Sequence, residues 1–485
     1  MTEAINKKKT IINSIYVYFG EIISKAILFL FNAIVARQLG VIDYGLYTFS
    51  LSIGLILIGV IDFGTNNFVL KKISEDKSRN IHYLWKVIQL EWILSILSLV
   101  GLFIFLKFVN YEKNTKMIII ILYFSLVFEN ITNVFRNVLK ALERFGLDGL
   151  ISVLSSVLRI VFALGFYYII HDIYGLSIGV VFSTLIALLI SFFIAKRAIK
   201  DISYEQIEIA ENMFVIFKSC SLFALPIIIK GIYLRIDAIL VKNFITAFNL
   251  GLYNSVLKLL FVQYFLPNGI VQVVFPSLNR LFCKKDYDNI NTIFPKIFTI
   301  LVVSFNIIQM FQVIFASYII QLIYGTDFMK ATMTYQLIIM SFLFTSTNVL
   351  LNFVFIANNN IQLTNKYYVF GIIIKLLLTI VLTKQLNILG AAVAFLISEI
   401  LQLLVFLIGC IHYNIKYKNS YFLILFNIML LDIVLFLLPI NIFVKLITLL
   451  GVSLIILQCF QINLLSYIKF ICKNIGKKHM REGVN

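Results

Sequence analysis

Charged residues are scarce in this chain. Asp, Glu, Lys and Arg make up 13% of its 485 residues, and hydrophobic residues make up 61%. Soluble domains average about 25% charged residues, so the composition excludes a soluble globular protein of this length. Apolar runs of about 18 residues or more recur along the chain, and runs such as MIIIILYFSLVF do not alternate as the strands of a β-barrel would. The chain is therefore predicted to be an all-α polytopic membrane protein.

Residues for metal binding and catalysis are also few. Five cysteines and four histidines are scattered without CxxC or metal-ligand spacing. There is no P-loop, and the DFG at 62–64 lacks the Gly-rich loop and the HRD segment of a kinase. We therefore expect no cofactor, no metal and no enzymatic activity. A membrane glycosyltransferase or polymerase is disfavoured because the outward-facing loops are very short.

No polar stretch is long enough to form a soluble domain, since the longest, 196–212 and 279–295, have about 17 residues each. The functional apparatus must then lie within the membrane. The apolar runs predict about fourteen helices, near 11–36, 44–70, 83–108, 115–139, 148–171, 174–195, 213–243, 249–276, 296–324, 333–356, 364–384, 388–412, 420–438 and 441–470.

The net charge of +18 is concentrated in alternate breaks between these helices. This distribution follows the positive-inside rule and argues against nucleic-acid binding. It predicts that both termini are cytoplasmic and that the protein lies in the cell inner (cytoplasmic) membrane. The first helix contains Glu21 and Lys25 and lacks a small-residue cleavage site, so we expect it to remain as an anchor rather than to be removed as a signal peptide.

The chain contains an internal repeat. KAILFLFNAIVARQL from Lys25 aligns with KGIYLRIDAILVKNF from Lys230, and GLY at 45–47 then aligns with GLY at 251–253. Further on, Asn133 aligns with Asn348, Arg159 with Lys375, and Gly179 with Gly390. The offset drifts only from 205 to 216 residues before the last, weaker match, as small loop insertions would cause.

Six helices per repeat bring both copies into the membrane in the same sense, which predicts a parallel repeat with a central cleft between two lobes. The predicted domains are an N-terminal six-helix lobe at 1–200, a C-terminal six-helix lobe at 201–415, and two extra helices with a basic cytoplasmic tail at 416–485.

Four basic residues fall near mid-membrane as two pairs related by the repeat: Lys25 with Lys230, and Arg159 with Lys375. Lys25 lies roughly 21 Å into its helix, too far for easy snorkelling. Charges at this depth usually face a bundle interior or an aqueous pathway. We therefore predict a cationic cleft that binds an anionic solute.

A local ion pair with Glu21, four residues earlier, is an alternative explanation for Lys25. It does not extend to Lys230, because Pro226 takes the equivalent position. Arg159 and Lys375 have no acidic residue within one helical turn of their own helices. A symmetric cationic feature explains all four residues better.

Amides one helical turn apart give polar faces to further helices. They are expected to form interhelical hydrogen bonds or to line the cleft. The secondary polar lining is predicted to comprise Asn133, Asn137, Asn348, Asn352 and Lys258. For the intramembrane carboxylates, which include Glu91, Glu129 and Glu399, pairing with a basic residue is at least as good an explanation as ion coupling.

Five segments resemble the polysaccharide-export flippases of O-antigen and capsule pathways, in the multidrug/oligosaccharidyl-lipid/polysaccharide exporter superfamily. They are SKAILFLFNAIVARQLGVIDYGLYTFS, DFGTNNFVLKKIS, LRIDAILVKNF followed by NLGLYNSVLKLL, IYGTDFMKAT and ILGAAVAFLISEI. The resemblance covers about residues 10 to 412. It implies two lobes in a V and alternating access, by which an undecaprenyl-diphosphate-linked oligosaccharide is moved between leaflets. Ser24–Lys25 and Ala36–Arg37 are similar to a pair of motifs on the first helix of lipid II flippases, where the cation is implicated in handling the headgroup.

The expected partners are this lipid-linked substrate, the membrane, and a polymerase or other polysaccharide-assembly proteins. Two other functions remain open besides the disfavoured glycosyltransferase or polymerase. One is a drug/cation antiporter of the same superfamily, which the excess of intramembrane cations disfavours. The other is a non-transporting scaffold in an assembly complex.

Overall fold

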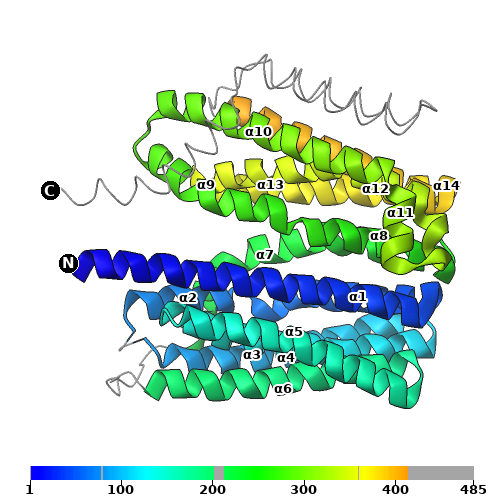
Figure 1. The fold of residues 1–485 in the computed structure, drawn as a ribbon, viewed down its shortest axis with the longest axis horizontal. Coiled ribbons are helices and arrows are strands. Elements are labelled where there is room, and N and C mark those ends of the chain that lie inside the picture. Colours follow the sequence, from blue (N-terminus) through cyan, green and yellow to red (C-terminus); the bar gives the residue numbers. More distant parts are fainter. Residues whose placement is uncertain (1, 78–79, 201–211, 359, 413–485) are drawn as a thin grey trace. The chain divides into compact units, whose positions relative to one another are not determined.

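We describe the protein from a computed structural model, in which residues 2–77, 80–200, 212–358 and 360–412 are described. Within these ranges all regular secondary structure is helical (Figure 1). The helices are α1 Thr2–Asp62, α2 Thr65–Glu75, α3 Tyr83–Phe108, α4 Lys113–Ala141, α5 Phe145–Ile170, α6 Ile173–Lys200, α7 Met213–Val241, α8 Ala247–Gln263, α9 Phe265–Cys283, α10 Tyr287–Ile314, α11 Ala316–Tyr324, the 3₁₀ helix η1 Thr326–Ala331, α12 Thr332–Ile339, α13 Phe342–Ala357 and α14 Ile361–His412.

Eight helices of the described ranges are long and apolar enough to cross a membrane. The number is nine if Met213–Ser221 and Phe223–Val241, bent by 51°, form one span. The prediction of a polytopic all-α membrane protein is therefore confirmed. The helices predicted at 420–438 and 441–470 lie outside the described residues, so the total of about fourteen stays a prediction.

Two long helices each contain a break where the sequence predicts a boundary between spans. Gly40 in α1 has φ 70° and ψ −179°, and Asn387 in α14 has φ 52° and ψ −133°. Gly adopts positive φ without steric cost, and Asn tolerates it better than most residues. Each long helix is thus two helical segments that meet at a sharp turn.

Four predicted spans are divided. Those expected at 44–70, 296–324 and 333–356 are interrupted between α1 and α2, between α10 and α11, and between α12 and α13. The helix expected over 249–276 is two helices, α8 and α9, separated at Tyr264. Pro267 explains the division, because proline has no backbone N–H to donate to residue 263 and its ring disfavours a continuous helix on its N-terminal side. A proline in the first turn of α9 is well tolerated.

The described residues pack as two compact units, one ending at Ser255 and the other beginning at Val256. Unit 1 contains α1 to α7 and the start of α8. The predicted domain boundary at residue 200 was inferred from the internal repeat, whereas the two units are defined by packing. That boundary therefore stays a prediction.

In unit 1, α1 runs beside α5, and α4, α5 and α6 pack on one another (Figure 1). Small residues allow this close packing, as they commonly do in membrane bundles. A Cβ at Gly179 of α6 would lie 2.4 Å from the Phe162 carbonyl oxygen of α5. A Cβ at Gly390, its repeat partner in unit 2, would lie 1.9 Å from the Leu382 carbonyl oxygen of the preceding segment. The two matched glycines therefore have the same role in their own units.

Candidate functional site

Four helices of unit 1 enclose a cavity of about 240 Å³. Pockets for drug-sized ligands usually measure roughly 300–1,000 Å³, so this cavity has room for part of a large ligand, such as one headgroup. The lining residues are Glu21, Ser24, Lys25 and Leu28 from α1; Glu129, Thr132, Asn133 and Arg136 from α4; Ser152, Ser155, Ser156 and Arg159 from α5; and Thr184 and Ala187 from α6.

The lining residues follow a single spacing. On α1, α4 and α5 they fall at positions i, i+3, i+4 and i+7, which share one face of a helix. All of them except Leu28 and Ala187 have polar side chains. Each of these apolar helices therefore turns a narrow polar face toward the interior of unit 1, and the cavity lies where these faces meet.

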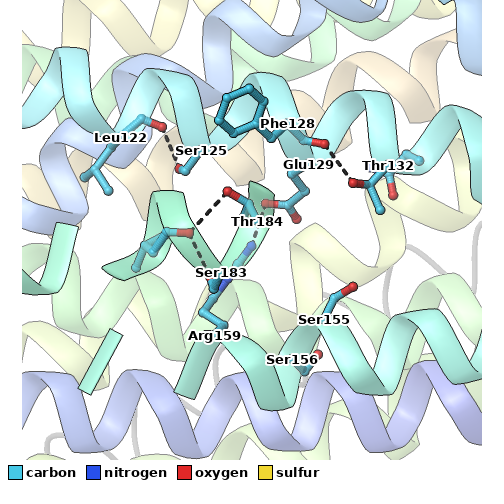
Figure 2. A network of polar contacts seen from close by, with 12 residues as sticks. Leu122, Ser125, Phe128, Glu129, Thr132, Ser155, Ser156, Arg159, Ser183 and Thr184 are labelled. Atoms are coloured by element: carbon cyan, nitrogen blue, oxygen red, sulfur yellow. Dashed lines mark hydrogen bonds and ion pairs between the residues drawn. The ribbon is translucent and has the colours of Figure 1, made fainter. Parts of the chain in front are cut away.

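Arg159 is neutralised from a neighbouring helix. Its Nη2 lies 2.9 Å from Oε2 of Glu129 on α4, and Figure 2 shows the two side chains pointing toward one another. The Arg159 side chain is 19% exposed and the Glu129 side chain 39%. The sequence shows no acid within a turn of Arg159 because its partner lies on α4. Of the two explanations left open for Glu129, the structure shows pairing with a basic residue.

A second group of charges borders the cavity near the start of α5. Asp148 is fully buried, and its oxygens lie 2.7 Å from Nε of Arg136 and 3.6 Å from Nζ of Lys140. The same Lys140 lies 3.6 Å from Glu21 of α1. Nearby, the hydroxyl groups of Ser24 and Ser156 are 2.5 Å apart. These contacts connect α1, α4 and α5 and fix the positions of their polar faces.

The cavity has a small excess of positive charge. Its lining contains three cations and two carboxylates. Nε of Arg159 and Nη2 of Arg136 are buried with no hydrogen-bond acceptor in the described structure. An unsatisfied buried donor costs about 1–3 kcal/mol, so an anionic ligand that accepted from these groups would remove that cost.

Lys25 is exposed on unit 1 and also lines the cavity, so it lies where the cavity opens. The structure thus brings three predicted site residues together: Lys25, Arg159 and Asn133. The alternative of a local pair between Lys25 and Glu21 stays a prediction.

The other predicted cations do not line this cavity. Lys230 is half-buried on α7 in unit 1, and Lys258 is half-buried on α8 in unit 2. Lys375 of α14 is completely buried, with its Nζ 4.1 Å from the ring centroid of Phe395, which is a cation–π distance. Their role in a shared cationic cleft remains a prediction.

The remaining predicted amides form interhelical contacts. Asn137 donates to Asn66 of α2 at 2.8 Å, and Asn348 donates to the Glu399 carboxylate of α14 at 3.1 Å. Asn352 is buried on α13. The default interpretation, hydrogen bonding between helices, is thus confirmed for Asn137 and Asn348.

Sequence reasoning missed several lining residues, notably Arg136 and the three serines of α5. The spacing of Ser152, Ser155, Ser156 and Arg159 could have revealed them, because four polar residues on one face of an apolar helix stand out as a stripe. The identity of the helix that faces this stripe is not encoded in the spacing.

Solved structures with a similar fold are flippases and transporters. The lipid II flippase MurJ in an inward closed conformation gives a TM-score of 0.69 at 16% identity, covering 93% of this chain and 98% of that chain. A multidrug resistance transporter of the MATE family in an inward-facing conformation gives 0.64 at 14% identity, covering 80% and 94%. The fold therefore defines the class, a multi-pass membrane protein built like MurJ and the MATE transporters.

Residues 11–282, more than half of the chain, match the family described as polysaccharide biosynthesis protein, and the chain belongs to that family. The capsular polysaccharide biosynthesis protein CapF of Staphylococcus aureus is 23% identical over 80% of this chain and 96% of its own length. The probable low-salt glycan biosynthesis flippase Agl15 of Haloferax volcanii is 23% identical over 80% of each chain. The family resemblance is confirmed at the level of polysaccharide biosynthesis proteins, and the relative Agl15, a probable flippase, agrees with a transporter rather than an enzyme.

Proposed function

We propose that this protein is a flippase that moves an undecaprenyl-diphosphate-linked oligosaccharide, an O-antigen or capsule repeat unit, across the cytoplasmic membrane by alternating access. The family match and the fold of MurJ support lipid-linked transport. The observation that carries the proposal is the polar cavity within unit 1, in an otherwise apolar bundle, which has three cations and two carboxylates.

In this mechanism the cavity of unit 1 receives the anionic part of the substrate. Lys25 at the opening attracts the diphosphate or acidic sugars as a point charge, while a guanidinium can bind two oxygens at once. An anion that reaches Arg159 competes with Glu129 for it. The hydroxyl and amide groups of the three polar faces then form hydrogen bonds with sugar hydroxyls.

Lys230 and Lys375, the repeat partners of Lys25 and Arg159, complete the cationic feature in our proposal. Asn137, Asn348, Asn352 and Lys258 contribute to its polar surroundings. The lipid tail stays in the bilayer, both termini are cytoplasmic, and a polymerase uses the product on the other side of the membrane.

The test is polysaccharide export in a strain that lacks the protein. The strain is complemented with Lys25→Gln, Arg159→Gln, Lys230→Gln, Lys375→Gln or the double variant Lys25→Gln/Arg159→Gln. Lys113→Gln is the matched control, since Lys113 is exposed at the start of α4. We expect each single variant to lose roughly tenfold in export, because one charge-assisted contact contributes about 1.5–3 kcal/mol, and the double variant to fall to background.

Lipid-linked oligosaccharide should accumulate in the membrane of the double variant. Full export by all four single variants and by the double variant would refute the cationic-cleft proposal.

A drug/cation antiporter is the second candidate, favoured by the MATE transporters of similar fold and by Glu21 and Glu129 in the cavity lining. An antiporter should protect cells against cationic drugs, and Glu129→Gln should abolish that protection. We expect instead that deletion of this protein changes drug sensitivity no more than other mutations that remove surface polysaccharide do.

A further inference from the structure

A buried carboxylic acid of unit 1 lies outside the lining of the cavity. Glu91 of α3 is 0% exposed. Its Oε1 forms a hydrogen bond with the hydroxyl group of Thr65 at the start of α2, and the Thr65 hydroxyl oxygen also lies 3.2 Å from Oδ1 of Asp62 at the end of α1. Two carboxyl groups therefore share one hydroxyl group.

The number of hydrogens decides the protonation state of this trio. The Thr65 hydroxyl group has one hydrogen and can donate it to only one carboxyl group. If both acids were ionised, the other contact would bring two oxygens together with no hydrogen between them. A proton on Glu91 removes the conflict, because Glu91 then donates to Thr65 and Thr65 donates to Asp62.

Asp62 is the better-supported anion of the two. Its Oδ1 also accepts from the backbone N–H of Asn66 at 3.1 Å and from the side-chain amide of Asn66 at 2.9 Å. Glu91 has no cation in contact within the described structure, and its Oε2 is buried with no hydrogen-bond partner. A fully buried carboxylate with so little support is costly, whereas the neutral acid is not.

Few other groups near Glu91 can change charge. Asp62 of α1 acts on it, and Cys220 of α7 lies close enough to interact with both acids. From α2 and α4 the described neighbours are the neutral side chains Thr65 and Asn130. Asn130 offers Glu91 a side-chain amide, which is a neutral hydrogen-bond donor. Among the residues that the structure describes, the trio therefore has no basic neighbour that could hold both acids ionised.

We propose that Glu91 is a proton-binding site, in which an exchangeable proton on the Glu91 carboxyl group is relayed through Thr65 to Asp62. When Glu91 releases its proton, the Thr65 hydroxyl group passes its own hydrogen to Asp62 and receives the one from Glu91. No other co-reactant is needed, and the proposal does not depend on the identity of the transported substrate.

The site adjoins a break in the chain that packs against α7. Gly64, between α1 and α2, has φ 82°, and a Cβ there would lie 2.6 Å from the Cys220 carbonyl oxygen. The rings of Phe63 and Phe217 stack with centroids 4.6 Å apart. Loss of the proton to the surroundings leaves two anions at one hydroxyl group, and their repulsion strains this break. Proton release is therefore coupled to the contact of the α1–α2 break with α7.

Infrared spectroscopy of the full-length protein in lipid tests the site directly. We expect the wild type at neutral pH to show the C=O band of a protonated carboxylic acid. The band should be lost in Glu91→Gln and kept in Glu112→Gln, a matched control in which an exposed acid is changed. The band should shift in Thr65→Val, because that variant removes the acceptor of the Glu91 proton.

Identical carboxylic-acid bands in the wild type and Glu91→Gln would overturn the proposal. If Glu91→Gln does not fold, Asp62→Asn provides the test, and it should retain the carboxylic-acid band. Loss of the band in Asp62→Asn would assign the proton to Asp62 and would also overturn the proposal.

Coupling to α7 is measured by alkylation of Cys220 in a background without the other four cysteines. We divide the alkylation rate of Cys220 in the wild type by its rate in Glu91→Gln. This ratio should rise severalfold from mildly acidic to mildly alkaline pH, because only the wild type can release a proton from position 91. A constant ratio would overturn the coupling.

Discussion

At the residue scale, charges in apolar helices were the most informative feature of the sequence. Lys25 and Arg159 were recognised because a cation at this depth in a membrane is costly without a partner or water, and the structure places both on one cavity. Glu129, the partner of Arg159, was recognised only as an intramembrane acid. Which helix faces which depends on the packing of all side chains, and the composition of one helix does not determine it.

The Arg159–Glu129 pair gives the first prediction. Glu129→Gln leaves a cation without its partner in the cavity wall, and Arg159→Gln leaves a carboxylate, so each single variant should unfold at a lower temperature than the wild type. The double variant should be more stable than either single variant, because it leaves no unpaired charge. The coupling should amount to about 1 kcal/mol, since both side chains are partly exposed. Thermal unfolding in detergent measures it, and additive losses would show that the pair is not coupled.

Asp148 gives a second prediction at this scale. It is completely buried and contacts both Arg136 and Lys140, so Asp148→Asn leaves two cations without their common anion. We expect a loss of about 3 kcal/mol in the free energy of unfolding. Asp172→Asn, at an exposed position between α5 and α6, is the control and should be nearly neutral. Equal stability of the two variants would contradict the structural role of Asp148.

At the element scale, helix type and most boundaries could be predicted, because long apolar runs in a membrane have few alternatives to helix. The break at Gly40 also lies in a predicted gap. The division of α8 from α9 was missed, although Pro267 was visible, since a proline within an apolar run can also lie inside a kinked helix. The polar faces of α1, α4 and α5 were visible only in part, because serine is common in membrane helices and often bonds to its own backbone, as Ser155 does to Ile151.

Close packing of α5 on α6 gives a prediction for two glycines. A Cβ at Gly179 would lie 2.7 Å from the Ala163 backbone, whereas a Cβ at Gly165 on α5 meets nothing within 4 Å. Gly179→Ala should therefore separate the helices and lower the yield of folded protein. Gly165→Ala should raise stability by about 0.5–1 kcal/mol, since alanine is the better helix former. Fluorescence-detected size-exclusion chromatography compares the two, and equal profiles would contradict the close contact.

At the scale of the whole molecule, the charge distribution predicts the orientation, and the internal repeat predicts the symmetry. Gly45 and Gly251 are matched by the repeat, and a Cβ at Gly45 would lie 2.6 Å from the Cα of Gly251 within unit 1. The parallel arrangement of the two repeats stays a prediction. The sequence could not predict which polar helix faces meet to form the cavity, since that depends on the packing of four helices.

Orientation is tested with single cysteines in a background without the native five. Lys113→Cys lies at the start of α4, and Arg144→Cys lies between α4 and α5, both at exposed positions. If both termini are cytoplasmic, a membrane-impermeant thiol reagent added to intact cells should label position 113 and should label position 144 only after permeabilisation. The reverse pattern would contradict the orientation inferred from the positive charges.

The central claim is that the cavity of unit 1 binds the anionic headgroup of a lipid-linked oligosaccharide during transport. Its most direct measurement is the rate at which purified protein in proteoliposomes moves a fluorescent undecaprenyl-diphosphate oligosaccharide between leaflets. We predict flipping by the wild type and by Lys113→Gln, and a rate for Lys25→Gln/Arg159→Gln close to that of protein-free vesicles. Flipping by the double variant at the wild-type rate would contradict the claim.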